Sequence, residues 1–184
     1  MGLQIESGEG NSFIAGVNSE NRLKVASVSE TREHILNHEF GVVYSYGVET
    51  TPTSAGNCFL YIKNNDARDM IVSEFMLSVD TNETITIKLG DSGTPIGGST
   101  GTFQNRNAGS GNDASVTSLY GTNITGLDGG NPVMSVFLKG GESGKYIRPL
   151  SAFIIPQNKV ITGYITTGAI GIKLGMGVSF SKEC

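Results

Sequence analysis

The sequence predicts an all-β fold: a two-sheet, jelly-roll-like β-sandwich with one short helix and a long glycine-rich loop. From residue 41 onward, short runs rich in β-branched and aromatic residues alternate with turn-forming residues. One stretch alone has a helical pattern, and there is no alternation of strands with long helices. The chain has 26 glycines among 184 residues and 38% hydrophobic residues, which suits many short strands around one core.

Two parts are predicted along the chain: an N-terminal arm over residues 1–20 and a β-sandwich domain over residues 21–184. The arm lacks sustained periodicity. Residues 22–28 alternate apolar and polar side chains and predict a short strand. The next segment, 30–40, predicts one or two helical turns, with Ser27 and Glu30 at the spacing of a capping box.

Eight further segments predict the strands of the sandwich. They are residues 41–48, 57–64, 70–79, 83–90, 132–139, 151–156, 159–166 and 170–180. Residues 140–150 have the composition of a loop, and the turn at 156–159 predicts a hairpin between its flanking strands. The last strand has one apolar face and an opposite face with Gly175 and Gly177, which suggests the close approach of another backbone, such as a neighbouring subunit.

In residues 70–79, alternate side chains can be assigned to one face of a regular strand. Phe75, Leu77 and Val79 fall on the same face as Ile71 and Ser73. We expect this face to point into the core.

Residues 90–131 are polar, glycine-rich and poor in aliphatic side chains. A connection of this length inside a compact domain is uncommon unless it has a function. We expect a loop that projects from the sandwich and is partly paired through residues 115–121.

Charge and hydropathy exclude several classes of partner. The formal net charge of -4 is spread along the chain, without the clustered Lys and Arg that contact phosphates, so nucleic acid is not an expected partner. No apolar run is long enough to span a bilayer, and the start of the sequence has no signal-peptide pattern. We therefore expect synthesis in the cytoplasm and no membrane association. Cys58 and Cys184 do not form a disulfide framework and are expected to be reduced.

The sequence predicts no catalytic residue, no metal site and no cofactor. His34 and His38 would share a helical face, but a third ligand and a general base at residue 35 are missing, so the two residues are interpreted as polar surface groups rather than metal ligands. The aspartates fall in turn contexts, where side-chain hydrogen bonds to the backbone are the simpler role. A serine nucleophile has no matching context.

Candidate contact residues come from the arm and from the long loop. In the arm they are Ile5, Phe13 and Ile14, and in the loop they are Phe103, Arg106 and Tyr120. Aromatic side chains together with amides and hydroxyls suit a surface that contacts a carbohydrate or a protein. The alternative is that the aromatic side chains anchor the loop onto the sandwich.

Two short motifs resemble the structural proteins of tailed-bacteriophage particles, among them capsid decoration, or cement, proteins. In the first, Asn21, Leu23 and Val25 lead into Ser29, Glu30 and His34, and the second is Tyr61-Ile62-Lys63-Asn64. The resemblance covers about a quarter of the chain and carries no catalytic residue.

The resemblance implies a non-enzymatic subunit on the exterior of the virion capsid, with the major capsid protein as its partner and a homotrimer as its state. The alternative from the same context is a tail or fibre module that binds a host receptor or a glycan, because both kinds of protein use the same fold. An enzyme would instead need a pocket with clustered acids.

Overall fold

A computed structural model describes residues 5–6, 12–13 and 32–181. The chain divides into two units, Met1–Thr31 and Arg32–Cys184. In the first unit, β1 (Ile5–Glu6) pairs antiparallel with β2 (Ser12–Phe13), and Ile5 lies opposite Phe13. The strand predicted at 22–28, the capping residues Ser27 and Glu30, and Ile14 lie outside the described residues.

The second unit begins with the short helix α1 (Arg32–His38), which confirms the helix expected over 30–40. Leu36 is buried in the core, whereas His34 and His38 are exposed on the other side of the helix. Within the described residues, no helix has the length and apolar character required to cross a membrane.

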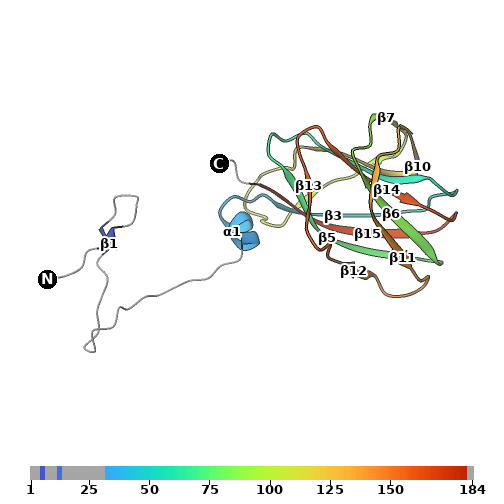
Figure 1. Cartoon of the computed structure of the whole chain (residues 1–184). Helices are drawn as coiled ribbons and strands as arrows, with labels where there is room; N and C mark the ends of the chain where they lie inside the picture. The colour runs from blue at the N-terminus through green and yellow to red at the C-terminus, as the bar shows by residue number, and fades with distance from the viewer. Residues whose placement is uncertain (1–4, 7–11, 14–31, 182–184) are drawn as a thin grey trace. The chain divides into compact units, whose positions relative to one another are not determined.

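Two antiparallel sheets form the sandwich (Figure 1). The strands of the first sheet are β4 (Cys58–Asn64), β6 (Glu83–Leu89), β7 (Gly93–Ile96), β8 (Ser99–Thr100), β10 (Val116–Leu127), β11 (Asn131–Leu138) and β14 (Val160–Ile165). The strands of the second are β3 (Val43–Thr50), β5 (Met70–Val79), β9 (Gln104–Asn105), β12 (Lys145–Ile147), β13 (Phe153–Ile155) and β15 (Ile172–Phe180). The first sheet has the order β11-β6-β14-β4-β10-β7, with β8 beside β10, and the second has the order β12-β5-β15-β3-β9, with β13 beside β5.

Strand order confirms the jelly-roll prediction. The chain changes sheet at each step from β3 through β4 and β5 to β6. After β11 it crosses to β12 and β13 in the second sheet, returns to β14 in the first and crosses again to β15. The first and last of these strands, β3 and β15, are neighbours in one sheet, and β4 and β14 are neighbours in the other. Nested pairing of this kind is the arrangement of an eight-stranded jelly roll, with β12 and β13 sharing one strand position.

Apolar alternation places the core between the two sheets. On β15, Ile172, Leu174, Met176 and Val178 are buried and Lys173 is exposed, as the sequence predicts. On β5, the prediction is right for Phe75, Leu77 and Val79 but wrong for the first half of the strand, where Met70 and Val72 are buried instead. A register shift places Gly177 opposite Glu74 but Val178 opposite Val72, so Ser73 is an extra residue that inverts the alternation.

Two predictions about connections need correction. The turn at 156–159 is tight, with Lys159 N donating to Pro156 O at 3.0 Å, but it is not a hairpin because β13 and β14 belong to different sheets. The segment 140–150, expected to be a loop, contains β12, which pairs with β5. Its three residues are too few to show alternation in the sequence.

The glycine-rich segment 90–131 supplies strands β7 to β10. The pairing expected through residues 115–121 is confirmed and is more extensive, because β10 pairs with β4 while β9 pairs with β3. The segment therefore extends both sheets at the same side of the sandwich. At the crossing of β7 and β10, Gly93 (φ +94) and Gly126 (φ +77) have backbone conformations that only glycine adopts readily.

Candidate functional site

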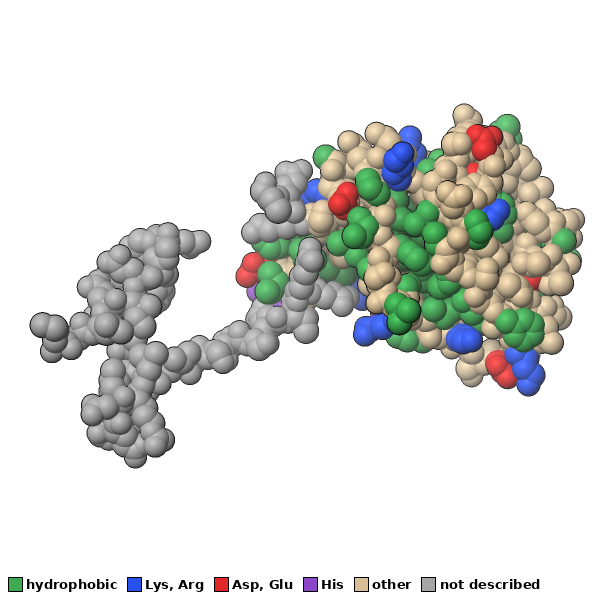
Figure 2. All heavy atoms as spheres, in the orientation of Figure 1, with side chains coloured by type: hydrophobic (Ala, Val, Ile, Leu, Met, Phe, Trp, Pro, Cys, Tyr) green, Lys and Arg blue, Asp and Glu red, His purple; other side chains and the backbone are tan. Residues whose placement is uncertain are grey.

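One side of the sandwich exposes large apolar side chains. We call this set the apolar edge; it comprises Met76, Val133, Phe137, Tyr146, Leu150 and Ile154, which lie on or beside β11, β12, β13 and the adjoining part of β5. Phe137 is 60% exposed and Ile154 58%. Figure 2 shows hydrophobic side chains gathered on the visible face of the described domain, where β5, β12 and β13 run in Figure 1. Val133 and Phe137 lie on the outer face of the first sheet, and Met76, Tyr146 and Ile154 lie on the outer face of the second, so the set borders this side of the sandwich on both faces. Exposed apolar side chains beside the ends of two sheets favour an interaction surface.

The strands of the apolar edge also end their sheets. In the described part of the chain, β11 pairs with β6 alone, and β12 and β13 pair with β5 alone. The outer backbone groups of β11 are therefore available for pairing with another chain. The opposite side of the sandwich differs, because the 90–131 segment pairs with β4 and with Tyr44 and Ser45 at the start of β3.

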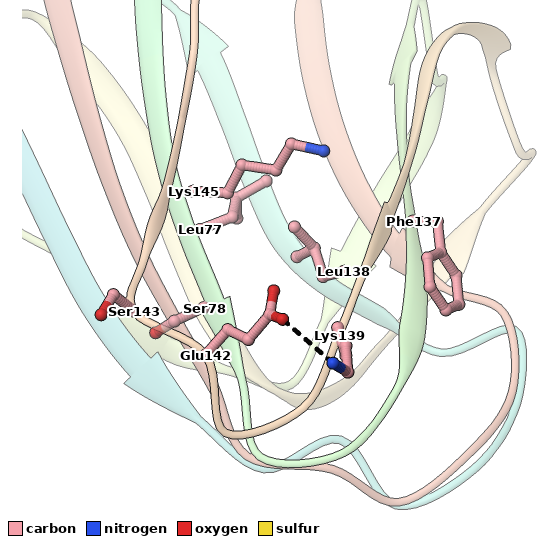
Figure 3. A pocket seen from close by; sticks show the side chains of 8 residues that line it. All are labelled: Leu77, Ser78, Phe137, Leu138, Lys139, Glu142, Ser143 and Lys145. Atoms are coloured by element: carbon pink, nitrogen blue, oxygen red, sulfur yellow. Dashed lines mark ion pairs between the residues drawn. The ribbon is translucent and has the colours of Figure 1, made fainter.

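A cleft opens between β11 and β5 at this edge (Figure 3). Its volume is about 430 Å³, and the buried side chains of Leu77 and Leu138 close its floor. Lys139 and Glu142 form an ion pair of 3.3 Å across one end of it. Figure 3 shows Phe137 on the other side of β11 from Leu138, so alternation along one strand separates the cleft from the exposed surface.

A polar network lies on the outer face of the second sheet, next to the apolar edge. Glu74 accepts a hydrogen bond from the hydroxyl of Tyr146 and one of 3.0 Å from Arg106 Nη2, and it lies 3.7 Å from Arg148 Nη2. Arg148 Nε donates to the Tyr146 hydroxyl at 2.8 Å. The hydrogen bond from Tyr146 and the two guanidinium groups lower the pKa of Glu74, which keeps this carboxylate charged.

The network crosses a groove whose floor is glycine. Arg106 follows β9 and reaches Glu74 on β5 across β3 and β15, over positions occupied by Ser45 and Gly177. Two hollows, of about 170 and 690 Å³, share Ser45 as a lining residue, and we treat them together as the groove. Thr100, Thr102 and Gln104 line the larger hollow.

The candidate contact residues of the loop are placed differently from one another. Phe103 is 8% exposed and packs against Tyr46 with ring centroids 4.6 Å apart, so its expected role as a contact residue is wrong; it anchors the segment to the core. Arg106 and Tyr120 are partly exposed and line the groove. Ile5 and Phe13 oppose each other in the first unit.

The glycine-lined face of β15 receives atoms of its own chain. A Cβ atom at Gly177 would lie 2.6 Å from Glu74 Oε1, so the expectation of a neighbouring backbone is wrong at this position, where a side chain approaches. Sequence reasoning missed Glu74, Tyr146 and Arg148 because they come from two strands far apart in the sequence. The bulge at Ser73 inverts the alternation of β5, and the segment that contains β12 has the composition of a loop, so the sequence does not predict that Glu74 and Tyr146 lie on the same face of the sheet.

The groups considered as chemical sites have structural partners. The rings of His34 and His38 stack at 5.7 Å, and among the described residues no three His, Cys, Asp or Glu side chains gather in a way that could hold a metal ion. Asp66 accepts from the backbone N of Arg68 at 3.0 Å, which is the turn role expected for it. Cys58 is buried and free, and burial raises the pKa of its thiol to about 12. Cys184 lies outside the described residues.

Comparison with known proteins gives no relative: no family model, curated protein or solved structure matches the chain.

Proposed function

We propose that this chain is a non-enzymatic structural subunit of a bacteriophage virion, a decoration or cement protein that binds the outside of the capsid shell. The apolar edge is the observation that carries the proposal. It combines exposed apolar side chains with strands whose outer backbone groups can pair with another chain. Such an edge favours association with a protein surface that covers it.

The proposal assigns separate contacts to the two units of the chain. The outer part of the apolar edge, with Val133, Phe137, Leu150 and Ile154, joins neighbouring copies into a homotrimer, which buries these side chains and the strand edges, whereas Met76 and Tyr146 face the groove on the second sheet and stay uncovered. Residues 1–20, including Ile5, Phe13 and Ile14, contact the major capsid protein. Three arms on one trimer turn weak individual contacts into strong attachment, because the second and third contacts form at high effective concentration.

Solution mass tests the role of the apolar edge. By light scattering, the wild-type protein is expected to have three times the 19.4 kDa mass of the chain. The double variant Phe137→Ser and Ile154→Ser is expected to be monomeric with an unchanged β-sheet circular dichroism spectrum, because both side chains are exposed within the subunit. Ile96→Ser is the matched control, since Ile96 is 64% exposed but lies on β7, away from the edge. A wild-type monomer would contradict the role of the edge.

Location on the particle tests the virion assignment. An antibody raised against residues 32–181 and labelled with gold is expected to mark the capsid surface of purified virions in electron micrographs. Label on the tail would support the alternative, a tail or fibre module that binds a host receptor or a glycan. The groove on the second sheet is the observation that favours this alternative. Virions without label would rule out both.

A further inference from the structure

Two glycines in the floor of the groove are not explained by the packing of the described chain. Gly47 on β3 and Gly175 on β15 are direct cross-strand partners. A Cβ atom at Gly47 would have no neighbour closer than 3.9 Å, and one at Gly175 would lie 3.6 Å from the side chain of Met76. Gly47 and Gly175 do not have a positive φ, so their backbone conformation does not require glycine. Glycine weakens the interior of a strand, so a pair of glycines with room for side chains indicates the close approach of another molecule.

The walls of the groove carry polar groups held in fixed positions. Tyr146 is 54% exposed, and its hydroxyl is held by Glu74 and Arg148, which fixes the orientation of the ring. Gln104, Thr100 and Thr102 supply amide and hydroxyl groups at the other end. A few placed polar groups beside an aromatic surface are typical of sites for small polar ligands.

We propose that this groove binds a neutral oligosaccharide. The exposed Tyr146 ring provides a flat apolar surface for the C–H face of a sugar, and the amide, hydroxyl and guanidinium groups bind sugar hydroxyls. Over Gly47 and Gly175, a sugar ring can lie against the backbone because no side chain rises there.

Charge favours a neutral ligand over a charged one. Glu74 is paired with Arg106 and Arg148, and Lys173 pairs with Glu49 at 3.4 Å on the same face. The acidic and basic groups along the groove therefore compensate one another to within one charge. A polyanionic or polycationic ligand would find no field of opposite sign.

Strand pairing disfavours an extended peptide over the β15 part of the groove. Peptides that add to a sheet use the free backbone groups of an edge strand. β15 is paired on both sides, with β3 and β5. β3 pairs with β9 only at Tyr44 and Ser45, so its outer backbone groups beside Gly47 have no strand partner among the described residues. A peptide over Gly175 would leave its own backbone groups without partners, and strand addition of a peptide along β3 would overturn the sugar proposal.

Saturation-transfer NMR with the full-length protein tests the proposal. The probes are maltohexaose, cellohexaose, xylohexaose and chitohexaose, each at millimolar concentration. At least one of them is expected to receive saturation from the protein. The variant Gly47→Val, which fills the groove, is expected to weaken that binding at least about tenfold while its melting temperature equals or exceeds that of the wild type.

Two further variants distinguish sugar binding in the groove from sugar binding at the apolar edge. Gln104→Ala is expected to weaken sugar binding without loss of folding, and Ile154→Ser, at the apolar edge, is expected to leave sugar binding unchanged. Absence of binding by all four sugars overturns the proposal, as does wild-type binding by Gly47→Val. A loss of oligomer mass in Gly47→Val would also overturn it, because the groove would then receive a neighbouring copy. Failure of the trimer test alone leaves the groove proposal standing.

Discussion

At the scale of single residues, Glu83 shows how a buried carboxylate joins separate parts of the domain. It is 1% exposed and lies at the start of β6. Its carboxylate accepts hydrogen bonds from the backbone N of Thr84, Thr166 and Thr167, at 2.7, 3.0 and 2.9 Å, and from the Thr167 hydroxyl at 2.6 Å. The carboxylate therefore fixes the turn between β14 and β15 to the start of β6.

Substitution of Glu83 by Gln is expected to lower the free energy of unfolding by about 1–3 kcal/mol at neutral pH. Burial alone would raise the pKa of Glu83, but the hydrogen bonds from Thr167, Thr84 and Thr166 outweigh it, and the folded-state pKa is lowered from 4.5. The stabilisation is thus complete above pH 4.5 and is lost as the pH falls through the lower folded-state pKa. Urea unfolding at several pH values measures both effects.

The control for this experiment is Glu142→Gln. Glu142 is 61% exposed and pairs with Lys139 alone within the cleft, so its removal is expected to change the free energy of unfolding by less than about 0.5 kcal/mol. In Glu83→Gln the loss of stability at acid pH is expected to be smaller than in the wild type. An identical acid response in both proteins would show that Glu83 is not the titrating group.

At the scale of strands, the sequence predicts element type well and connections less well. Residues 70–79 and 83–90 match β5 and β6 because long runs of β-branched and aromatic residues identify strands. The same reasoning assigns the wrong face to Met70 and Val72, since one extra residue inverts the alternation without any signal in the composition.

The candidate site is harder to predict than the fold. Arg106 and Tyr120 stand out in a polar segment, and both line the groove. Phe103 stands out equally but is buried, since the sequence does not show which aromatic side chain meets Tyr46. The apolar edge depends on which strands end the sheets, and pairing order is a property of the tertiary structure.

The bulge in β5 leads to a prediction about deletions. Deletion of Ser73 removes the extra residue, so the buried residues of both halves of β5 keep their inward direction, and the variant is expected to fold with a loss of about 1–2 kcal/mol. Deletion of Met76, whose side chain is 55% exposed, would turn Leu77 and Val79 outward relative to Phe75 and is expected to cost more than about 4 kcal/mol. Thermal unfolding followed by circular dichroism compares the two variants. A lower melting temperature for the Ser73 deletion than for the Met76 deletion would contradict the assignment of the bulge.

At the scale of the whole domain, the two sides of the sandwich differ in how their strand edges are paired. Segment 90–131 pairs with β4 and with the start of β3 on one side, while β11, β12 and β13 end the sheets on the other side. The ends of the segment meet in space, because Gly129 N donates to Asp91 Oδ1 at 2.6 Å. The segment is therefore an addition to the connection between β6 and β11 that the jelly roll itself does not require.

Replacement of residues 92–128 by a short Gly-Ser linker tests this arrangement. We expect the shortened protein to keep its β-sheet circular dichroism but to melt at a lower temperature, because the buried side chains of Phe103 and Ile124 are lost, at about 2–5 kcal/mol each. It is also expected to form larger species as its concentration rises, since β4 would present a free edge. Light scattering over a concentration series measures this association.

A second substitution distinguishes edge pairing from general unfolding. Tyr61 lies on β4 and is buried in a cluster with Ile124, so it would become exposed in the shortened protein. Adding Tyr61→Lys to the shortened protein places a charge on the new edge, and an edge lysine opposes strand-to-strand pairing. The substitution is therefore expected to prevent the formation of larger species without raising the melting temperature. If the shortened protein associates equally with and without the lysine, the association comes from loss of structure, and the segment has a stabilising role rather than a protective one.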